Sequence, residues 1–189
     1  MRFVPARWIG ACALALAATG ALAMELAGVK LDERTSVAGK ELVLNGAGLR
    51  TRAIFKVYVA GLYLPAKTTD AAAALAAPAR RIELHLLRSL SADQLLDALN
   101  DGLRENNSEA DLAAIKAQVN ELAGIMKGFR QVKEGDVVAL EYADGATRVL
   151  QGGEVRGSIG GEAFNRALMK VWLGERPVQS DLKKALLGG

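Results

Sequence analysis

The chain has 189 residues, enough for one domain, of which 51% are hydrophobic, 24% charged and 5% aromatic. These proportions exclude a disordered chain and a typical polytopic membrane protein, and the scarcity of aromatics disfavours a single-strand nucleic-acid binder that stacks bases. The formal charge of +3 falls to +1 over residues 24–189, where 22 basic groups meet 21 acidic ones, so we expect no nucleic-acid partner.

The first 23 residues have the pattern of a cleavable export signal. Arg2 and Arg7 form a positively charged start, Trp8–Ala18 is an apolar run too short to span a bilayer comfortably, and Ala21-Leu22-Ala23 is a small-x-small cleavage site. We therefore expect a signal peptide over residues 1–23, one domain over residues 24–189, a periplasmic location and no stable membrane anchor.

Cysteine and histidine each occur once. Cys12 lies near the start of the apolar run, which argues against lipid attachment, and the exported chain then has no cysteine. His85 lies in an apolar, strand-like stretch, where we expect its ring to be satisfied by local partners. With no thiol nucleophile, no nucleophile-elbow sequence and a single histidine, the sequence predicts no zinc or haem site, no cofactor and no Ser-His-Asp triad.

The first half of the exported chain is strand-rich. Gly46-Ala47-Gly48 is expected to break the chain, and the following stretch, 51–64, carries β-branched and aromatic residues on both alternating sets, which indicates one strand covered on two sides. Pro65 ends this strand, and the alanine-rich residues 66–79 predict a short helix with a linker. Further strands are predicted over residues 26–31, 40–44 and 81–87.

The second half alternates helices with a hairpin. Ser91 and Gln94 form a capping box before one helix, Ser108 caps a second that Gly128 ends, and Asp144-Gly145 is a two-residue hairpin turn. The other predicted elements are strands over 137–142, 147–151 and 154–158, a helix through Phe164 and Trp172 that Gly174 ends, and a last short helix capped by Ser180. This order predicts an α+β fold with a largely antiparallel sheet and helices on one face.

Arg50 is the most informative candidate for a functional residue. A guanidinium stays charged, so it needs solvent, a carboxylate or a bound anion. Tyr58 has the same parity as Arg50, so both side chains can face one side and grip a carboxylate or phenolate together. The alternative is a structural arginine–aspartate pair at Arg50 with a packed tyrosine. The sequence also leaves open whether a neighbour such as Glu83 or Glu141 neutralises Arg50.

Two motifs resemble a known family. Residues 44–65, LNGAGLRTRAIFKVYVAGLYLP, are similar to the bacterial branch of the chalcone isomerase-like family, and residues 171–188, VWLGERPVQSDLKKALLG, resemble its C-terminal signature. The resemblance implies an open-faced β-sandwich, a large antiparallel sheet with a helical layer on one face and a ligand cleft between them.

The resemblance also implies roles for particular residues. Arg50 matches the arginine with which plant chalcone isomerases contact the substrate phenolate. Tyr58 stands where those enzymes have threonine, and the fatty-acid-binding members of the superfamily instead pair arginine with tyrosine on a carboxylate. Val171 and Trp172 match substrate-contacting positions, and the bulky Trp172 would reshape a flavonoid pocket.

Three functions follow as hypotheses. The first is an exported binder of a small hydrophobic carboxylate, fatty-acid-like, with Arg50 and Tyr58 at the head group and Val171 and Trp172 lining the pocket. The second is an intramolecular lyase or isomerase of chalcone-like enones, with Arg50 and Tyr58 as catalytic residues acting on a phenolic ligand. The third is a non-catalytic protein-interaction module. The sequence leaves the oligomeric state open.

Overall fold

The computed structural model describes residues 23–129 and 131–189, and its centre is one seven-stranded sheet. Every neighbouring pair of strands is antiparallel, in the order β11-β10-β9-β6-β5-β4-β3. The strands are β3 (Arg34–Val37), β4 (Lys40–Arg52), β5 (Phe55–Leu64), β6 (Arg80–Leu86), β9 (Val137–Ala143), β10 (Ala146–Gln151) and β11 (Glu154–Gly160). Two small two-stranded sheets pair β1 (Ala23–Leu26) with β2 (Val29–Asp32) and β7 (Leu90–Ser91) with β8 (Gln131–Val132). The predicted signal peptide lies outside the described residues, except for Ala23, which begins β1.

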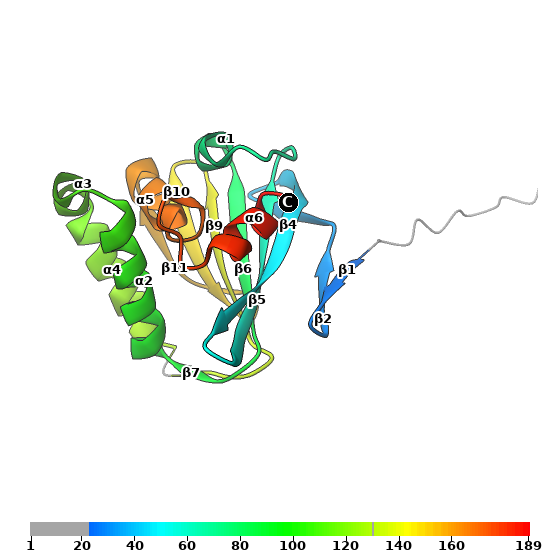
Figure 1. Ribbon diagram of the computed structural model, residues 1–189. Coiled ribbons are helices and arrows are strands. Elements are labelled where there is room, and N and C mark those ends of the chain that lie inside the picture. The colour runs from blue at the N-terminus through cyan, green and yellow to red at the C-terminus, as the bar shows by residue number, and fades with distance from the viewer. Residues whose placement is uncertain (1–22, 130) are drawn as a thin grey trace, which may run out of the picture.

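Helices form a layer on one face of this sheet, as Figure 1 shows. They are α1 (Ala71–Ala76), α2 (Ala92–Asn106), α3 (Glu109–Ala114), α4 (Lys116–Lys127), α5 (Glu162–Leu173) and α6 (Ser180–Leu186). The predicted α+β architecture, with a large antiparallel sheet and a helical layer, is thereby confirmed. None of the helices in the described ranges is long and apolar enough to cross a membrane.

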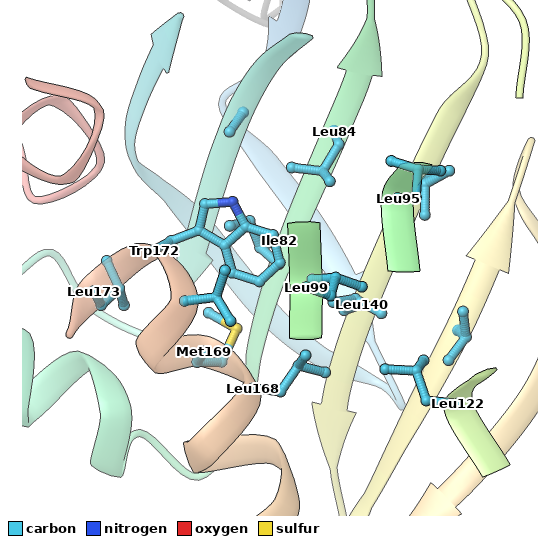
Figure 2. Close-up of a cluster of buried hydrophobic side chains, with 14 of the residues drawn as sticks. Ile82, Leu84, Leu95, Leu99, Leu122, Leu140, Leu168, Met169, Trp172 and Leu173 are labelled. Carbon is cyan, nitrogen blue, oxygen red and sulfur yellow. The ribbon is translucent and has the colours of Figure 1, made fainter. Parts of the chain in front are cut away.

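The main core lies between the helices and the sheet. Alternate residues of β6 point to opposite faces, and Ile82 and Leu84 belong to the helix-covered face. Leu99 of α2 and Leu168 and Trp172 of α5 project toward the sheet and belong to the same buried cluster (Figure 2). The whole of α5 is anchored in this way, because eight of its twelve residues are buried.

The opposite, open face of the sheet carries both a small apolar cluster and charged groups. Leu31 of β2 covers Gly61, whose hydrogen leaves room for it: a Cβ there would lie 2.6 Å from the leucine methyl. Arg81, Glu83 and His85 occupy the open-face positions of β6, and Glu83 Oε1 lies 2.9 Å from His85 Nε2. The prediction that His85 is satisfied locally is confirmed.

The predicted single strand over residues 51–64 is wrong, because a tight turn divides it. β4 runs on to Arg52, Ala53 adopts a positive φ of 52°, and β5 begins at Phe55. A positive φ is uncommon for alanine, and the turn contains none of the glycine, asparagine or proline residues that mark turns in a sequence. The predicted strand over residues 26–31 is divided in the same way by Ala27 and Gly28, and it forms the β1–β2 hairpin.

Gly46-Ala47-Gly48 does not break the chain, contrary to expectation. These residues lie inside β4, and α6 packs directly on them. A Cβ on Gly46 would lie 2.1 Å from the carbonyl oxygen of Ala185, and one on Gly48 would lie 2.7 Å from a methyl of Leu182. The glycines therefore serve close approach of a helix rather than a turn.

The helical predictions hold with two corrections. The capping box of Ser91 with Gln94 is confirmed, and the helix after Ser108 is divided at Ile115 into α3 and α4. The predicted cap of the last helix at Ser180 is wrong, because Gln179 holds the N-cap position and its side chain turns elsewhere. The hairpin at Asp144-Gly145 is confirmed, with both residues at positive φ.

Candidate functional site

Arg50 and Tyr58 face each other across the β4–β5 hairpin. They are direct partners in the antiparallel register, and Tyr58 belongs to the core on the helix-covered face. Side chains of directly opposed residues share one face of a sheet, so both point toward the helical layer. The predicted proximity of Arg50 and Tyr58 thus results from cross-strand pairing rather than from their parity along one strand.

The Tyr58 hydroxyl is held by the indole of Trp172. The Nε1–H of Trp172 donates a hydrogen bond of 3.0 Å to the phenolic oxygen, and both side chains are buried. Burial raises the pKa of Tyr58 above its ordinary value, while the Trp172 hydrogen bond and the nearby charge of Arg50 oppose that rise. Tyr58 is therefore neutral at physiological pH, and its own proton has no acceptor among the described residues. Its O–H is available to an incoming group.

Arg50 has no acidic partner within the described residues. Its Nη1 donates to the carbonyl oxygen of Thr51 at 2.6 Å and to Oε1 of Gln179 at 3.3 Å, and both acceptors are uncharged. Glu83 and Glu141, the neutralising groups considered from the sequence, are engaged on the open face: Arg81 contacts both, and Arg148 lies 2.8 Å from Glu141. The alternative of a structural arginine–carboxylate pair is therefore wrong for Arg50.

Gln179 is a site residue that sequence reasoning missed. Its Oε1 accepts a 2.9 Å hydrogen bond from the backbone N–H of Thr51 as well as the contact from Arg50, and its Nε2 donates to the carbonyl of Leu49 at 3.3 Å. It ties the start of α6 to the end of β4 and fixes the guanidinium. A lone glutamine after Pro177-Val178 resembles a surface residue, so no local signal reveals this role.

An apolar cavity of about 50 Å³ opens beside Tyr58 between the sheet and the helices. Its lining comes from four strands and three helices, together with Val178 just before α6. The lining residues are Tyr58, Leu84, Leu95, Ala98, Leu99, Met126, Val138, Leu140, Val149, Val171, Trp172 and Val178. Both C-terminal positions singled out from the sequence, Val171 and Trp172, thus line the same cavity as Tyr58, and Ala98, which is exposed, marks its mouth on α2.

The chemistry of this arrangement is that of a polar head beside an apolar chamber. A cationic donor at Arg50 and a neutral donor at Tyr58 suit an anion with two oxygens, and hydrogen bonds to charged groups are the stronger kind. The residues that line the chamber are aliphatic apart from Tyr58 and Trp172, and none of them is acidic or basic. Within the described ranges, no three His, Cys, Asp or Glu side chains gather as a metal site.

The model of a known family matches nearly all of the described chain. Residues 23–188 match the family described as chalcone isomerase-like. The chain belongs to the chalcone isomerase-like family. No curated protein matches the sequence.

A solved structure shows that this chalcone isomerase-like chain shares its fold with a plant protein. The crystal structure of an Arabidopsis thaliana fatty-acid binding protein superposes with a TM-score of 0.68 at 14% sequence identity. The match covers 88% of this chain and 96% of the plant chain, so the two share the complete fold. The resemblance inferred from the two sequence motifs is confirmed, both for the family and for the sheet with its helical layer.

Proposed function

We propose that this protein is an exported, periplasmic binder of a small hydrophobic carboxylate, such as a fatty acid. The observation that carries the proposal is Arg50, a partly buried cation with no acidic partner in the described chain, beside the unused O–H of Tyr58 at an apolar cavity. The guanidinium stays charged and has more donors than these two uncharged acceptors use, so a ligand carboxylate would complete this site.

The head group would be gripped by two donors of different kinds. Arg50 supplies a charge-assisted hydrogen bond, worth roughly 1.5–3 kcal/mol, and the neutral Tyr58 hydroxyl supplies a weaker one. Trp172 keeps the phenolic oxygen in place, and Gln179 keeps the guanidinium in place. Because a carboxylate accepts from both donors and an alcohol gains no charge-assisted bond, the site would select acids.

The tail would supply most of the affinity and would require the cavity to widen. Each buried methylene contributes about 0.8 kcal/mol, so a long tail outweighs the head group. A cavity of about 50 Å³ is too small for it, since holding benzene takes roughly 150 Å³. Leu95 and Leu99 of α2 and the flexible Met126 of α4 line the cavity from the helical side, and their movement would enlarge it.

Two further observations support the proposal. The fold is that of a plant fatty-acid binding protein, over almost all of both chains. The export-signal pattern of residues 1–23 supports a location outside the cytoplasm, where the proposed site would meet free fatty acids rather than their activated thioesters.

Native mass spectrometry of the protein purified from a periplasmic extract tests the proposal. We expect a retained mass that matches a hydrophobic acid in the wild type and its loss in Arg50→Ala. Arg104→Ala is the matched control, because that side chain is exposed on α2 and pairs with Asp101. A retained acid that survives Arg50→Ala would refute the head-group role.

Titration with defined ligands separates the head from the tail. Arg50→Ala should lower the affinity for a fatty acid at least about tenfold and leave the affinity for the matching fatty alcohol nearly unchanged. Equal losses for acid and alcohol would contradict the assignment of Arg50. If wild-type protein binds neither but turns over a chalcone in an Arg50-dependent way, the isomerase hypothesis replaces the binder.

The mouth of the cavity offers a test that leaves the head group intact. Ala98 is exposed at the rim, so Ala98→Phe should block entry without overfilling the core, and binding of acid and alcohol should both fall. Ala113→Phe, at an exposed position of α3, is the matched control. Undiminished binding in Ala98→Phe would place the ligand elsewhere.

A further inference from the structure

The turn between β4 and β5 exposes two adjacent large apolar side chains. Ile54 is 88% exposed and Phe55 53% exposed, and the other large hydrophobic residues exposed in the described chain, Met24 and Val155, lie elsewhere and singly. Single exposed hydrophobic residues need no explanation. This pair needs one, because its two members are adjacent at the apex of a hairpin. That hairpin projects from one end of the sheet, at the lower end in Figure 1.

Basic side chains surround this apex, which we call the β4–β5 tip, residues 52–56. Arg52 and Lys56 flank the apolar pair and are exposed, and the guanidinium of Arg88 stacks on the Phe55 ring at 4.8 Å. The neighbouring loop, whose Gly135 N–H donates to the carbonyl of Leu86, adds Lys133, Glu134 and Asp136. Four basic side chains of the tip, Arg88 and this loop thus meet two acidic ones, so the region is positive overall.

We propose that the β4–β5 tip docks this protein on the surface of an anionic lipid bilayer. Ile54 and Phe55 enter the boundary between headgroups and acyl chains, while Arg52, Lys56 and Arg88 lie at the level of the lipid phosphates. Insertion of a few apolar side chains with cations around them is how peripheral segments bind anionic membranes.

A bilayer suits the tip better than a protein surface does. A stable protein interface buries roughly 800 Å² on each partner, whereas the tip offers two apolar side chains on a narrow turn. An anionic bilayer complements its charge and places no demand on matching shape. The three cations explain why the surface should be anionic rather than neutral.

The tip adjoins the candidate site. Arg50 lies two residues before Arg52 on β4, and Tyr58 lies two residues after Lys56 on β5. If the proposed function is correct, docking at the tip brings the cavity close to the membrane from which an acyl ligand would come. The docking itself does not depend on that function.

Sedimentation with vesicles tests the docking. We expect residues 24–189 to bind vesicles of equimolar phosphatidylcholine and phosphatidylglycerol, to bind pure phosphatidylcholine far more weakly, and to be released by salt. This span contains all the described elements except the first residue of β1, and it avoids the apolar run before residue 23. Equal binding to neutral vesicles, or none to anionic ones, would overturn the proposal.

Paired variants assign the binding to the tip. The double variant Ile54→Ser, Phe55→Ser should lower vesicle affinity by about tenfold or more. Val155→Ser, at an exposed position of β11, should leave it unchanged.

Charge variants test the basic side chains of the tip. Arg52→Gln and Lys56→Gln should each lower vesicle affinity about fivefold, and Arg104→Gln is the control that removes one positive charge elsewhere. Equal losses in the control variants would contradict docking at the tip. So would self-association without vesicles that the Ile54/Phe55 variant abolishes, which would indicate a second copy as the partner.

The two proposals can fail separately. The Ile54/Phe55 variant should bind a water-soluble short-chain acid in the absence of vesicles as the wild type does, because neither residue lines the cavity. Arg50→Ala should lose the acid and still sediment with anionic vesicles. Loss of vesicle binding in Arg50→Ala alone, with the Ile54/Phe55 variant unaffected, would refute docking by the tip.

Discussion

The indole N–H of Trp172 donates a hydrogen bond of 3.0 Å to the hydroxyl of Tyr58, and this bond links α5 to β5 inside the core. The two residues are 114 positions apart in the chain. The bond uses a lone pair of the phenolic oxygen and leaves the phenolic proton free. Trp172 thus orients a neutral donor beside Arg50, in addition to filling space as its size suggests.

Removing either partner of this bond should cost stability, and removing both should cost less than the sum. Tyr58→Phe leaves the buried indole N–H without an acceptor, at about 1–3 kcal/mol. Trp172→Phe removes the donor and opens a void, with a similar or larger cost. The double variant should show a coupling energy of about 1 kcal/mol in urea unfolding. Strictly additive losses would mean that the bond contributes nothing to the fold.

A carboxylate placed at position 179 should act as an internal competitor. Oε1 of Gln179 lies 3.3 Å from Arg50 Nη1, so Gln179→Glu would give the guanidinium the anion that it lacks. We expect at least about tenfold weaker binding of a hydrophobic acid and little change for the matching alcohol.

Gln179→Leu is the control for this experiment, since it removes the hydrogen bonds to Arg50 and Thr51 without adding charge. It should lower acid affinity less than Gln179→Glu does and should lower the melting temperature. Equal effects of the two variants on acid binding would show that the added carboxylate does not compete for Arg50 and that the loss of the amide contacts accounts for the change.

The sequence predicts the layers of this fold better than the positions where its strands begin, end and turn. The capping box at Ser91 and the hairpin at Asp144-Gly145 are local patterns, and both are present. The turn at Ala53 lacks the residues that mark turns, and the course of β4 through Gly46 depends on contacts with the distant helix α6, which a local pattern does not contain. Tertiary packing therefore decides where β4 and β5 begin and end.

The candidate site divides in the same way. Arg50 can be singled out because a charged residue in an apolar strand needs a partner, and the family resemblance adds Tyr58, Val171 and Trp172. The three lie together at the cavity, with Arg50 beside Tyr58. Gln179 could not be predicted, because its role arises only when α6 is seated on β4. The size of the cavity likewise depends on side-chain packing from seven elements.

Gly46 should not tolerate a side chain. In Gly46→Ala the new Cβ would meet the backbone carbonyl of Ala185, which cannot yield unless α6 moves away from β4. We expect a loss of about 1–3 kcal/mol in the free energy of unfolding, together with weaker acid binding because Gln179 at the start of α6 shifts. Gly124→Ala is the control: that position lies inside α4 with open space around it, and the change should stabilise by about 0.5–1 kcal/mol. If both variants were stabilised, α6 would not be seated as described.

The open-face carboxylate of Glu83 should make stability depend on pH in the acid range. Burial by itself would raise the pKa of Glu83, but the hydrogen bonds and charges of His85 and Arg81 outweigh it and hold that pKa below its ordinary value of 4.5. A carboxyl whose pKa is depressed in the folded state contributes stability above its unfolded pKa and loses it as the pH falls through the folded pKa. Unfolding free energies measured by urea from neutral to acid pH should therefore drop as the pH falls below about 4.5.

Glu83→Gln should remove much of this fall in unfolding free energy at acid pH. The variant should lose about 2 kcal/mol at neutral pH, because Tyr63, Arg81 and His85 all contact this carboxylate, and its stability should change less than that of the wild type on acidification. Glu41→Gln is the control, since Glu41 is exposed on β4 and its pair with Arg34 spans 3.8 Å in solvent. If the fall in stability at acid pH were unchanged in Glu83→Gln, the pH dependence would belong to other carboxylates. Burial of the Glu83 network on the open face, away from Arg50, means that acid binding at neutral pH should be the same in both variants.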